Sequence, residues 1–209
     1  MADGKVLFEG LFGEKGGICV SKTVVIADDE PITRIDLSEI MQSGSYDVVG
    51  LAPTGMDAVE LCKRHNPDLV ILDVKMPILD GIKAASIIKA EQLAGCIVLL
   101  TGYTDPDIIG KAVEAGVTGF VTKPFDENSI LPAVEVSMAK EMEINTYKKQ
   151  LDKLNEKMQD RILIEKAKGI LREEKDFTEE QAYQYMRKLA MDKGYKIATV
   201  ANAVVLNAV

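Results

Sequence analysis

The sequence predicts an α/β domain with a doubly wound, parallel five-stranded sheet, followed by a helical coiled-coil linker and a small three-helix bundle. Five short apolar runs alternate with five amphipathic segments over residues 23–138. Parallel strands need helical crossovers, so this alternation favours a sheet that helices cover on both faces. The runs lack polar alternation, which is typical of strands buried on both sides. With 209 residues the chain can form such a domain and a smaller one.

Helix start and stop signals set the expected boundaries of these elements. Proline marks a helix start, and glycine or an Asn-Pro pair marks a helix end. Strands are expected at residues 23–28, 47–52, 69–73, 97–101 and 118–122. Helices are expected at residues 31–43, 54–63, 82–94 and 106–115, and from 126 or 127 onward. The side chains expected to face inward from the first helix are Ile32, Ile35, Leu37, Ile40 and Met41.

Helical spacing continues beyond the fifth helix of the predicted domain. Apolar residues recur there at intervals of 3, 4, 3 and 4, which is a heptad seam: Ile144, Tyr147, Leu151, Leu154 and Met158. The seam covers only about two heptads, too few for a stable coiled coil on its own. Residues 139–160 are therefore predicted to be a linker that pairs with a second copy when another event favours pairing. The alternative is a helix that packs on its own domain.

Residues 161–209 are predicted to form the three-helix bundle. The first helix carries Leu163, Ala167, Ile170 and Leu171 on one face. The second opens at a capping box in residues 178–181 and ends at Gly194, and the third runs over residues 197–208. Residues 1–22 are rich in glycine and have no clear period, so they are expected to be a loose extension.

Charge and composition exclude several classes of protein. Residues 23–138 hold 8 Lys and Arg against 18 Asp and Glu, which suits a divalent cation and repels nucleic acid. Residues 155–209 hold 10 against 9, so this part is where a polyanion could bind, although the charge balance alone is weak support. His65 is the only histidine, which argues against His-based metal sites and Ser-His catalysis; we expect it on the surface. The three cysteines lack CxxC spacing and are expected to be reduced thiols.

The sequence pattern also gives no indication of a membrane-spanning segment or a secretion signal. No apolar run reaches the roughly 18 residues that span a bilayer. Acidic residues and glycines interrupt residues 1–22, where a signal peptide would lie. A cytoplasmic location without a membrane partner is the resulting expectation.

Polar side chains lie where the predicted strands end. Asp28 and Asp29 follow the first strand, Asp73 ends the third, Thr101 ends the fourth and Lys123 follows the fifth. The carboxyl ends of parallel strands meet at one edge of a sheet, so these groups should converge. Crowded carboxylates favour a cation, and Mg²⁺ suits an all-oxygen site. Asp73 could then attack phosphorus as a nucleophile while Lys123 and Thr101 contact the phosphoryl oxygens.

The joint motif resembles the receiver domain of two-component response regulators. It consists of the acid pair, Asp73-x-x-Met76-Pro77-x-x-Asp80-Gly81, Thr101-Gly102 and Lys123-Pro124-Phe125. The resemblance covers residues 23–138 and implies a flavodoxin-like fold with strand order 2-1-3-4-5. It implies that a sensor histidine kinase phosphorylates Asp73, and that Mg²⁺ is held by Asp28, Asp29, Asp73 and the backbone carbonyl of Lys75. It further implies that Thr101 and Phe120 form a switch pair, and often a cis Lys123–Pro124 bond.

The C-terminal bundle resembles the ANTAR domain, the RNA-binding output of certain antitermination regulators. The resemblance rests on residues 164–171, on 182–183 with 187–190, and on 196–197 with 200–201. Receiver, linker and ANTAR domain together are similar to the regulators of ethanolamine-utilisation operons. The candidate RNA contacts are Lys166, Lys168, Arg172, Arg187, Lys188 and Lys196, with Lys193 nearby. Tyr183 and Tyr195 are candidates for base stacking, although a tyrosine in a small bundle is more often part of the core.

The resulting hypothesis is a response regulator and not an enzyme. Phosphorylation of Asp73 would favour a homodimer that binds RNA hairpins in a leader transcript and causes transcription antitermination. One alternative is a DNA-binding response regulator, although the tail lacks a Gly-marked helix-turn-helix. A second is a metal-dependent phosphatase with an aspartyl intermediate, but Lys75 stands where such an enzyme would want a carboxylate. A third is a phosphorelay intermediate with a structural tail.

Overall fold

The computed structural model describes residues 21–102 and 106–208. The chain divides into two compact units, residues 1–141 and residues 142–209. None of the described helices is long and apolar enough to cross a bilayer.

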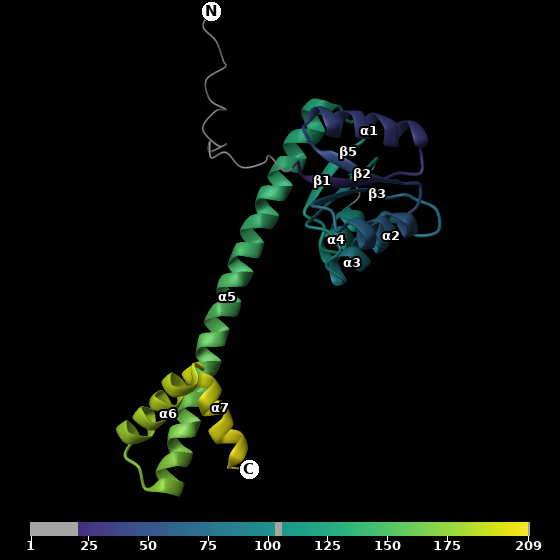
Figure 1. Ribbon diagram of the computed structural model, residues 1–209. Helices are drawn as coiled ribbons and strands as arrows, with labels where there is room; N and C mark the ends of the chain where they lie inside the picture. The colour runs from purple at the N-terminus through teal and green to yellow at the C-terminus, as the bar shows by residue number, and fades with distance from the viewer. Residues whose placement is uncertain (1–20, 103–105, 209) are drawn as a thin grey trace, which may run out of the picture. The chain divides into compact units, whose positions relative to one another are not determined.

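The first unit is an α/β domain (Figure 1). Its strands are β1 (Thr23–Ala27), β2 (Asp47–Ala52), β3 (Leu69–Asp73), β4 (Cys96–Thr101) and β5 (Gly119–Thr122). Its helices are α1 (Pro31–Ser43), α2 (Gly55–His65), α3 (Gly81–Ala90), α4 (Pro106–Glu114) and the first turns of α5 (Glu127–Lys175). The predicted alternation of strands and helices is confirmed.

All neighbouring strands in the sheet pair in parallel, in the order β2-β1-β3-β4-β5. Helices α2, α3 and α4 cover one face, and α1 and α5 cover the other (Figure 1). Alternate residues of each inner strand therefore enter different core layers. Val25 and Val70 pack in the first core layer, between the sheet and helices α2, α3 and α4. Val24 and Ile71 pack in the second core layer, between the sheet and helices α1 and α5. The flavodoxin-like fold and its strand order are as expected.

The prediction for the inner face of α1 is partly wrong. Leu37 and Met41 are fully buried, but Ile32 is 74% exposed and Ile35 is 54% exposed. Residues 37 and 41 are one helical turn apart and face the sheet. Ile32 and Ile35 lie on other faces of the helix and point to solvent.

Helix α3 ends four residues earlier than predicted, at Ala90. Gln92 adopts a left-handed conformation with φ of 54°, which no α-helix can accommodate. The N–H of Leu93 bonds to the carbonyl of Ile88, which closes the helix end. Leu93 and Ala94 then pack against the first core layer as a turn.

The thiols of Cys62 and Cys96 are free and buried, as predicted. Burial raises the pKa of the Cys62 thiol to about 12 and that of the Cys96 thiol to about 11. Both thiols are therefore protonated at neutral pH. Cys19 lies outside the described residues.

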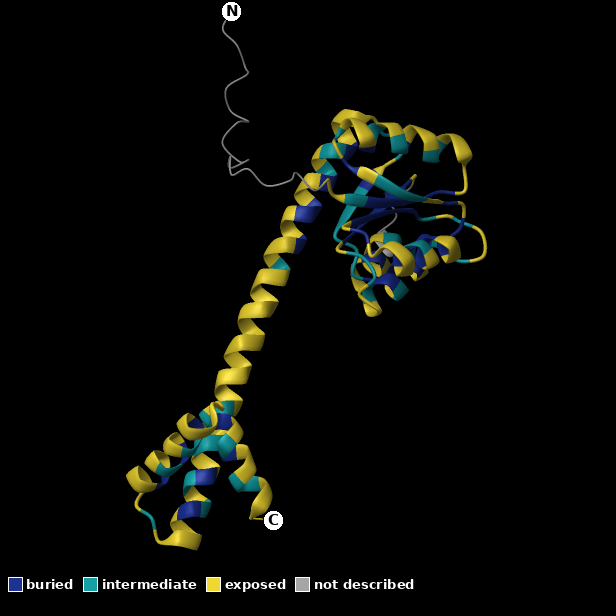
Figure 2. Ribbon diagram, in the orientation of Figure 1, coloured by how far each residue is buried: buried dark blue, intermediate teal, exposed yellow. Residues whose placement is uncertain are grey.

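Helix α5 is a single element where the sequence predicted a linker followed by a separate bundle helix. Its first turns are anchored on the sheet by Ile130, Val134 and Met138. The anchored part ends at Glu141, whose buried carboxylate accepts bonds from Lys89 Nζ (2.9 Å) and Thr118 Oγ1 (3.2 Å). Beyond Glu141 almost every residue up to 159 is exposed, as Figure 2 shows.

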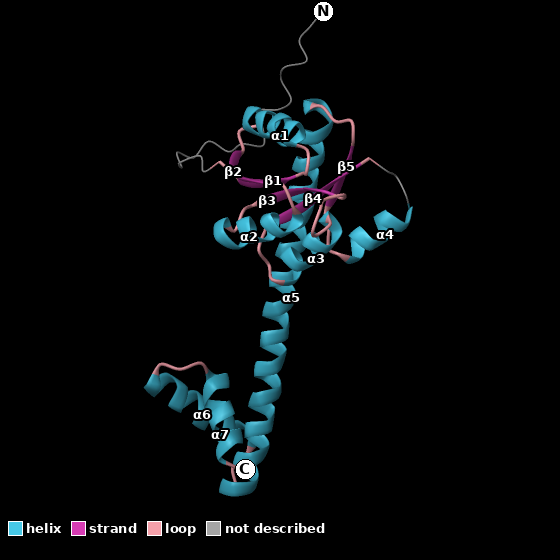
Figure 3. Cartoon of the chain, turned by 90° about the vertical axis from the view of Figure 1, so that its right-hand side faces the viewer, coloured by secondary structure: helices cyan, strands magenta, loops and turns pink. Residues whose placement is uncertain are grey.

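The second unit is a helical bundle that contains the C-terminal part of α5, α6 (Glu179–Lys193) and α7 (Ile197–Asn207) (Figure 3). Its buried core is Ala167, Leu171, Ala182, Met186 and Ala201. The predicted capping box is present, since Thr178 and Gln181 exchange side-chain bonds to each other's backbone N–H. Gly194 ends α6 with φ of 68°, as its position predicts.

Gly81 gives the first test of how the fold positions Asp73. A Cβ at residue 81 would lie 2.0 Å from the backbone carbonyl oxygen of Asp73. We expect Gly81→Ala to lower the free energy of unfolding by about 1–3 kcal/mol, because backbone must move. Urea denaturation measures this change.

Gly110→Ala is the matched control. A Cβ at Gly110 meets nothing within 4 Å, and the residue lies in α4. This variant should gain about 0.5–1 kcal/mol from helix propensity. Equal stability of Gly81→Ala and wild type would contradict the tight packing of the Asp73 carbonyl.

Candidate functional site

Asp73 ends β3, the central strand, and is 6% exposed. Every residue of this strand is buried, so the carboxylate is presented where the apolar core stops. Its Oδ1 lies 2.6 Å from Lys123 Nζ. Its Oδ2 accepts the backbone N–H of Lys75 at 2.8 Å. Both oxygens are therefore held in fixed directions.

Lys123 bridges two carboxylates from different strands. It follows β5, and its Nζ also lies 2.6 Å from Oδ2 of Asp28. Asp28 is fully buried, and its Oδ1 accepts the N–H of Glu30 at 2.9 Å. The N–H of Lys123 bonds to the Thr101 carbonyl at 2.8 Å, and the following Lys123–Pro124 bond is cis, as the family resemblance implied.

Burial and charge act on this triad in opposite directions. Burial raises the pKa of the Asp73 carboxyl above its ordinary value and Asp28 adds to the rise, although Lys123 and the Lys75 N–H oppose it. Burial lowers the pKa of the Lys123 ammonium, but the bonds to Asp28 and Asp73 outweigh this and raise it. The Lys123 ammonium therefore stays charged. For the Asp73 carboxylate, the contacts with Lys123 and the Lys75 N–H do not fully offset the cost of burial.

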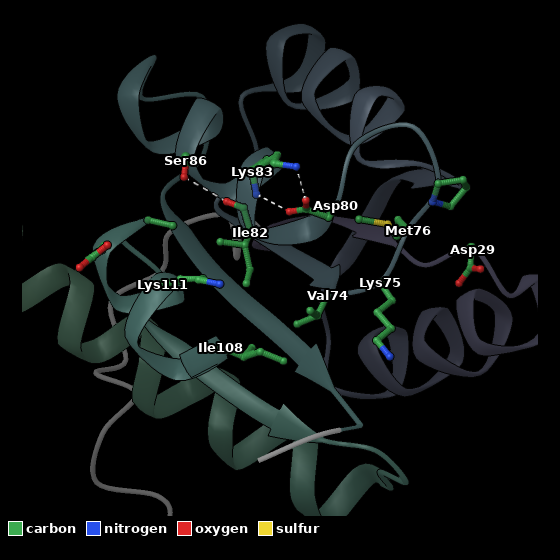
Figure 4. A pocket seen from close by; sticks show the side chains of 13 residues that line it. Asp29, Val74, Lys75, Met76, Asp80, Ile82, Lys83, Ser86, Ile108 and Lys111 are labelled. Atoms are coloured by element: carbon green, nitrogen blue, oxygen red, sulfur yellow. Dashed lines mark hydrogen bonds and ion pairs between the residues drawn. The ribbon is translucent and has the colours of Figure 1, made fainter. Parts of the chain in front are cut away.

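The site opens into a cavity of about 300 Å³. Its lining residues are Asp29, Glu30, Asp73, Val74, Lys75, Thr101, Gly102 and Lys123. A second cavity of about 970 Å³ lies along the loop after β3, α3 and α4, and it shares Asp29, Val74 and Lys75 with the first. Figure 4 shows the side chains of Asp29 and Lys75 at one end of this larger cavity, opposite Lys111.

The predicted metal ligands are brought to one edge of the sheet. In the described residues no three His, Cys, Asp or Glu side chains come together as a metal cluster. Asp28 directs its carboxylate to Lys123 and Glu30, whereas Asp29 and Asp73 open to the cavity. These carboxylate oxygens and surrounding water are the donors that Mg²⁺ prefers.

The predicted switch residues lie on adjacent strands. Thr101 is 5% exposed at the end of β4 and lines the cavity with Asp73 and Lys123. Phe120 is partly buried in β5, where it pairs with Leu99 and packs against the first core layer. Their movement on phosphorylation stays a prediction.

The predicted RNA contacts fall into two groups in the second unit. Lys166, Arg172, Arg187 and Lys188 are exposed. Lys168 is only 12% exposed and pairs with Glu165 (2.8 Å) and Glu179 (2.7 Å). Lys196 is 74% exposed and pairs with Glu156 at 3.0 Å. The role of these residues in RNA binding stays a prediction.

The tyrosines of the bundle differ in their environment. Tyr185 packs in the core, with its ring centroid 5.7 Å from that of Phe177 and Lys175 Nζ 4.7 Å from its centroid. Tyr183 is 36% exposed and Tyr195 is 62% exposed, so both are accessible to a stacking base.

Sequence reasoning missed the backbone contacts that fix the carboxylates. The N–H groups of Glu30 and Lys75, each two residues beyond the acid they hold, leave no side-chain signal. Gly81 is a sequence signal for a different contact, since it lies against the backbone carbonyl of Asp73, where a side chain would not fit.

Comparison with known proteins identifies both parts of the chain. The family described as response regulator receiver domain matches residues 24–135, and the ANTAR domain matches residues 152–205. The ANTAR match begins inside the stretch predicted as a linker.

The transcriptional regulatory protein PdtaR of Mycobacterium tuberculosis is 39% identical over 185 residues, which cover 88% of this chain and 90% of PdtaR. The chemotaxis protein CheY of Halobacterium salinarum is 37% identical over 115 residues, or 55% of this chain and 95% of CheY.

Solved structures resemble the first unit. The signal receiver domain of NarL from Mycobacterium tuberculosis matches with a TM-score of 0.54 and 32% identity, covering 57% of this chain and 97% of that one. A complex of CheX with CheY, BeF3 and Mg²⁺ from Borrelia burgdorferi matches with a TM-score of 0.51 and 28% identity, covering 54% and 86%. The chain therefore belongs to the response regulators of two-component systems, with an N-terminal receiver domain and a C-terminal ANTAR domain.

Proposed function

We propose that a sensor histidine kinase phosphorylates Asp73, and that the phosphorylated chain forms a homodimer that binds RNA hairpins in a leader transcript and causes antitermination. The observation that carries this proposal is the Lys123 ammonium, which lies 2.6 Å from both Asp28 and Asp73 at the opening of a cavity.

Phosphoryl transfer to Asp73 requires a nucleophile and a fixed positive charge. A carboxylate oxygen of Asp73 forms the new O–P bond while the N–P bond of the donor phosphohistidine breaks, and the imidazole leaves. The incoming oxygens bring negative charge to a largely buried site. Lys123 supplies a charged hydrogen-bond donor there, and Thr101 lines the same cavity. In-line positioning and charge stabilisation are the main needs of this reaction.

Mg²⁺ is the proposed cofactor. Asp28, Asp29 and Asp73 with the backbone carbonyl of Lys75 are its proposed ligands, and the ion would offset the negative charge of the carboxylates and the phosphoryl group. The similar CheY in the Borrelia complex was solved with BeF3 and Mg²⁺, which supports this choice.

Dimerisation is proposed to use the exposed seam of α5. Tyr147, Leu151, Leu154 and Met158 are each more than half exposed, at 57%, 60%, 63% and 54%. An open hollow lies along the same stretch of α5, lined by Leu154 and Met158 among others. Burying an exposed leucine is worth about 1.5–3 kcal/mol, which association costs of several kcal/mol largely cancel. A marginal dimer of this kind suits control by phosphorylation.

RNA binding is proposed to use the exposed cations of the bundle. Four exposed cations can contact phosphates directly: Lys166, Arg172, Arg187 and Lys188. Lys196 can do so if its ion pair with Glu156 breaks. Lys168 would have to break its ion pairs with Glu165 and Glu179, and its side chain is only 12% exposed. Its contribution to the RNA affinity should therefore be smaller. The match to the ANTAR family supports RNA as the target.

The prediction for phosphorylation compares Asp73→Ala with wild type, each treated with phosphoramidate. Treated wild type should form dimers and bind hairpin RNA at least about tenfold more tightly than untreated protein. The variant should change in neither property because it lacks the acceptor carboxylate. Sedimentation gives the mass, and filter binding gives the affinity for leader RNA recovered by crosslinking.

Duplex DNA at matched salt is the control ligand in this experiment. Preference for DNA would favour a DNA-binding regulator. Dimerisation and RNA affinity of Asp73→Ala equal to treated wild type would refute control through Asp73.

A separate prediction concerns the seam. Leu151→Lys should weaken dimerisation of the phosphorylated chain by more than about tenfold, because each copy loses a buried side chain and gains a charge. Thermal stability should not fall, since Leu151 is exposed in the chain. Sedimentation equilibrium measures the dissociation constant.

Asn145→Lys adds the same charge on another face of the same helix and serves as the control. It should dimerise like wild type. Equal dimerisation of Leu151→Lys and Asn145→Lys would rule out the seam as the interface.

A further inference from the structure

Gly169 lies in the interior of α5, where glycine is unfavourable. It is the one glycine in the 49-residue sequence of this helix. Glycine destabilises a helix interior relative to alanine, because it loses more backbone freedom on folding. The residue is exposed, its φ is not positive, and a Cβ there would meet nothing within 4 Å. Within the described residues, the bundle therefore gives no structural reason for glycine at this position.

The face of α5 that carries Gly169 points away from the bundle core. Ala167 and Leu171, two residues before and two residues after, are buried in that core. Two residues correspond to about 200° around a helix, so Gly169 lies on the opposite face. Lys166 and Arg172, three residues before and three after, are exposed beside it. Gly169 is thus a gap in the layer of side chains between two cations, which lie about 9 Å apart along the helix axis.

Acidic residues share this face and limit what can bind there. Glu165 and Glu173, four residues before and four after Gly169, are exposed, and Glu165 pairs with Lys168 at 2.8 Å. A second copy of α5 in register would bring like charges together at this turn, which disfavours helix pairing. An RNA strand can instead place phosphates on the two cations and an uncharged sugar over Gly169.

The backbone of α5 at Gly169 offers hydrogen-bond acceptors but no donors. Each N–H in a helix interior already bonds to a carbonyl four residues earlier, whereas each carbonyl oxygen keeps a second lone pair. Phosphate oxygens cannot donate to these carbonyls. The 2′-hydroxyl of RNA can donate, and DNA lacks this group. The exposed backbone beside Gly169 therefore suits a ribose better than a phosphate or a deoxyribose.

We infer that Gly169 is an RNA contact, at which one ribose approaches the backbone of α5 and its 2′-hydroxyl donates to a carbonyl oxygen of this turn. The flanking phosphates bind Lys166 and Arg172. The inference rests on the proposed RNA binding by the bundle. Because a side chain at residue 169 would occupy the space of the ribose, the missing Cβ is what permits the contact.

The test measures the affinity of the phosphorylated full chain for a leader hairpin recovered by crosslinking to wild type. Gly169→Ala should bind this hairpin at least about tenfold more weakly. Amide hydrogen exchange in α6 should slow by about two- to fivefold in the same variant, because alanine favours the helix and stabilises the bundle. Gly169→Gln, with a larger side chain, should lose at least as much affinity.

A set of hairpins that each carry a single 2′-deoxy substitution identifies the hydroxyl. One substitution should weaken binding to wild type and have no effect on binding to Gly169→Ala, because the variant has already lost that hydrogen bond. Substitutions elsewhere in the hairpin should weaken binding to both proteins equally.

Gly110→Ala is the matched control. Gly110 also lies inside a helix with nothing within 4 Å of a Cβ, but it lacks cations three residues before and after. This variant should bind the hairpin like wild type.

Wild-type affinity of Gly169→Ala would overturn the inference, as would the absence of any 2′-deoxy position that affects wild type alone. A loss of RNA affinity that follows a loss of dimerisation would also overturn it, because Gly169 would then contact a second copy. Recovery of no RNA from wild type, phosphorylated or not, would instead refute the proposed RNA binding.

Discussion

The Lys123 ammonium between Asp28 and Asp73 is the interaction on which the rest of the site depends. Both carboxylates lie at the ends of strands with completely buried apolar neighbours, and Asp28 has no exposed surface. Carboxylates in such positions are costly without a compensating charge. The strand order makes the compensation possible, because it places the ends of β1, β3 and β5 at one edge. Lys123, the residue directly after β5, then reaches two acids that are 95 and 50 residues away in the sequence.

Strand β5 links this charged edge to the base of α5. Lys123 follows the strand at its carboxyl end, and Thr118 precedes it at the other. Thr118 donates to Glu141, the last residue of α5 within the first unit, and Lys89 of α3 holds the same carboxylate. Phe120 lies between these two contacts in the same strand. The site around Asp73 and the end of the anchored part of α5 are therefore connected through a single short strand and its bonded neighbours.

The sequence predicted most of the receiver fold because buried parallel strands and their helices leave strong local patterns. The residues that meet at the site were also predictable, since strand ends converge by topology.

Three features were not predictable. The exposure of Ile32 and Ile35 depends on which side of α1 faces the sheet, and several apolar residues made that side ambiguous. The bonds from the N–H groups of Glu30 and Lys75 have no side-chain signature. The continuity of α5 is set by the absence of a stop signal, and a short seam gives little indication of where one helix becomes another. The narrower resemblance to ethanolamine-utilisation regulators stays a prediction, as do the domain boundaries at residues 138 and 160.

Chemical trapping of the phosphorylated residue tests the central claim most directly. The full chain is phosphorylated, reduced with borohydride, digested and analysed by mass spectrometry, so that an aspartyl phosphate is converted into homoserine. The account predicts homoserine at residue 73 alone, because among the described aspartates only Asp73 combines an open cavity with the Lys123 ammonium. Homoserine at residue 28 or 29, or modification of no aspartate, would contradict it.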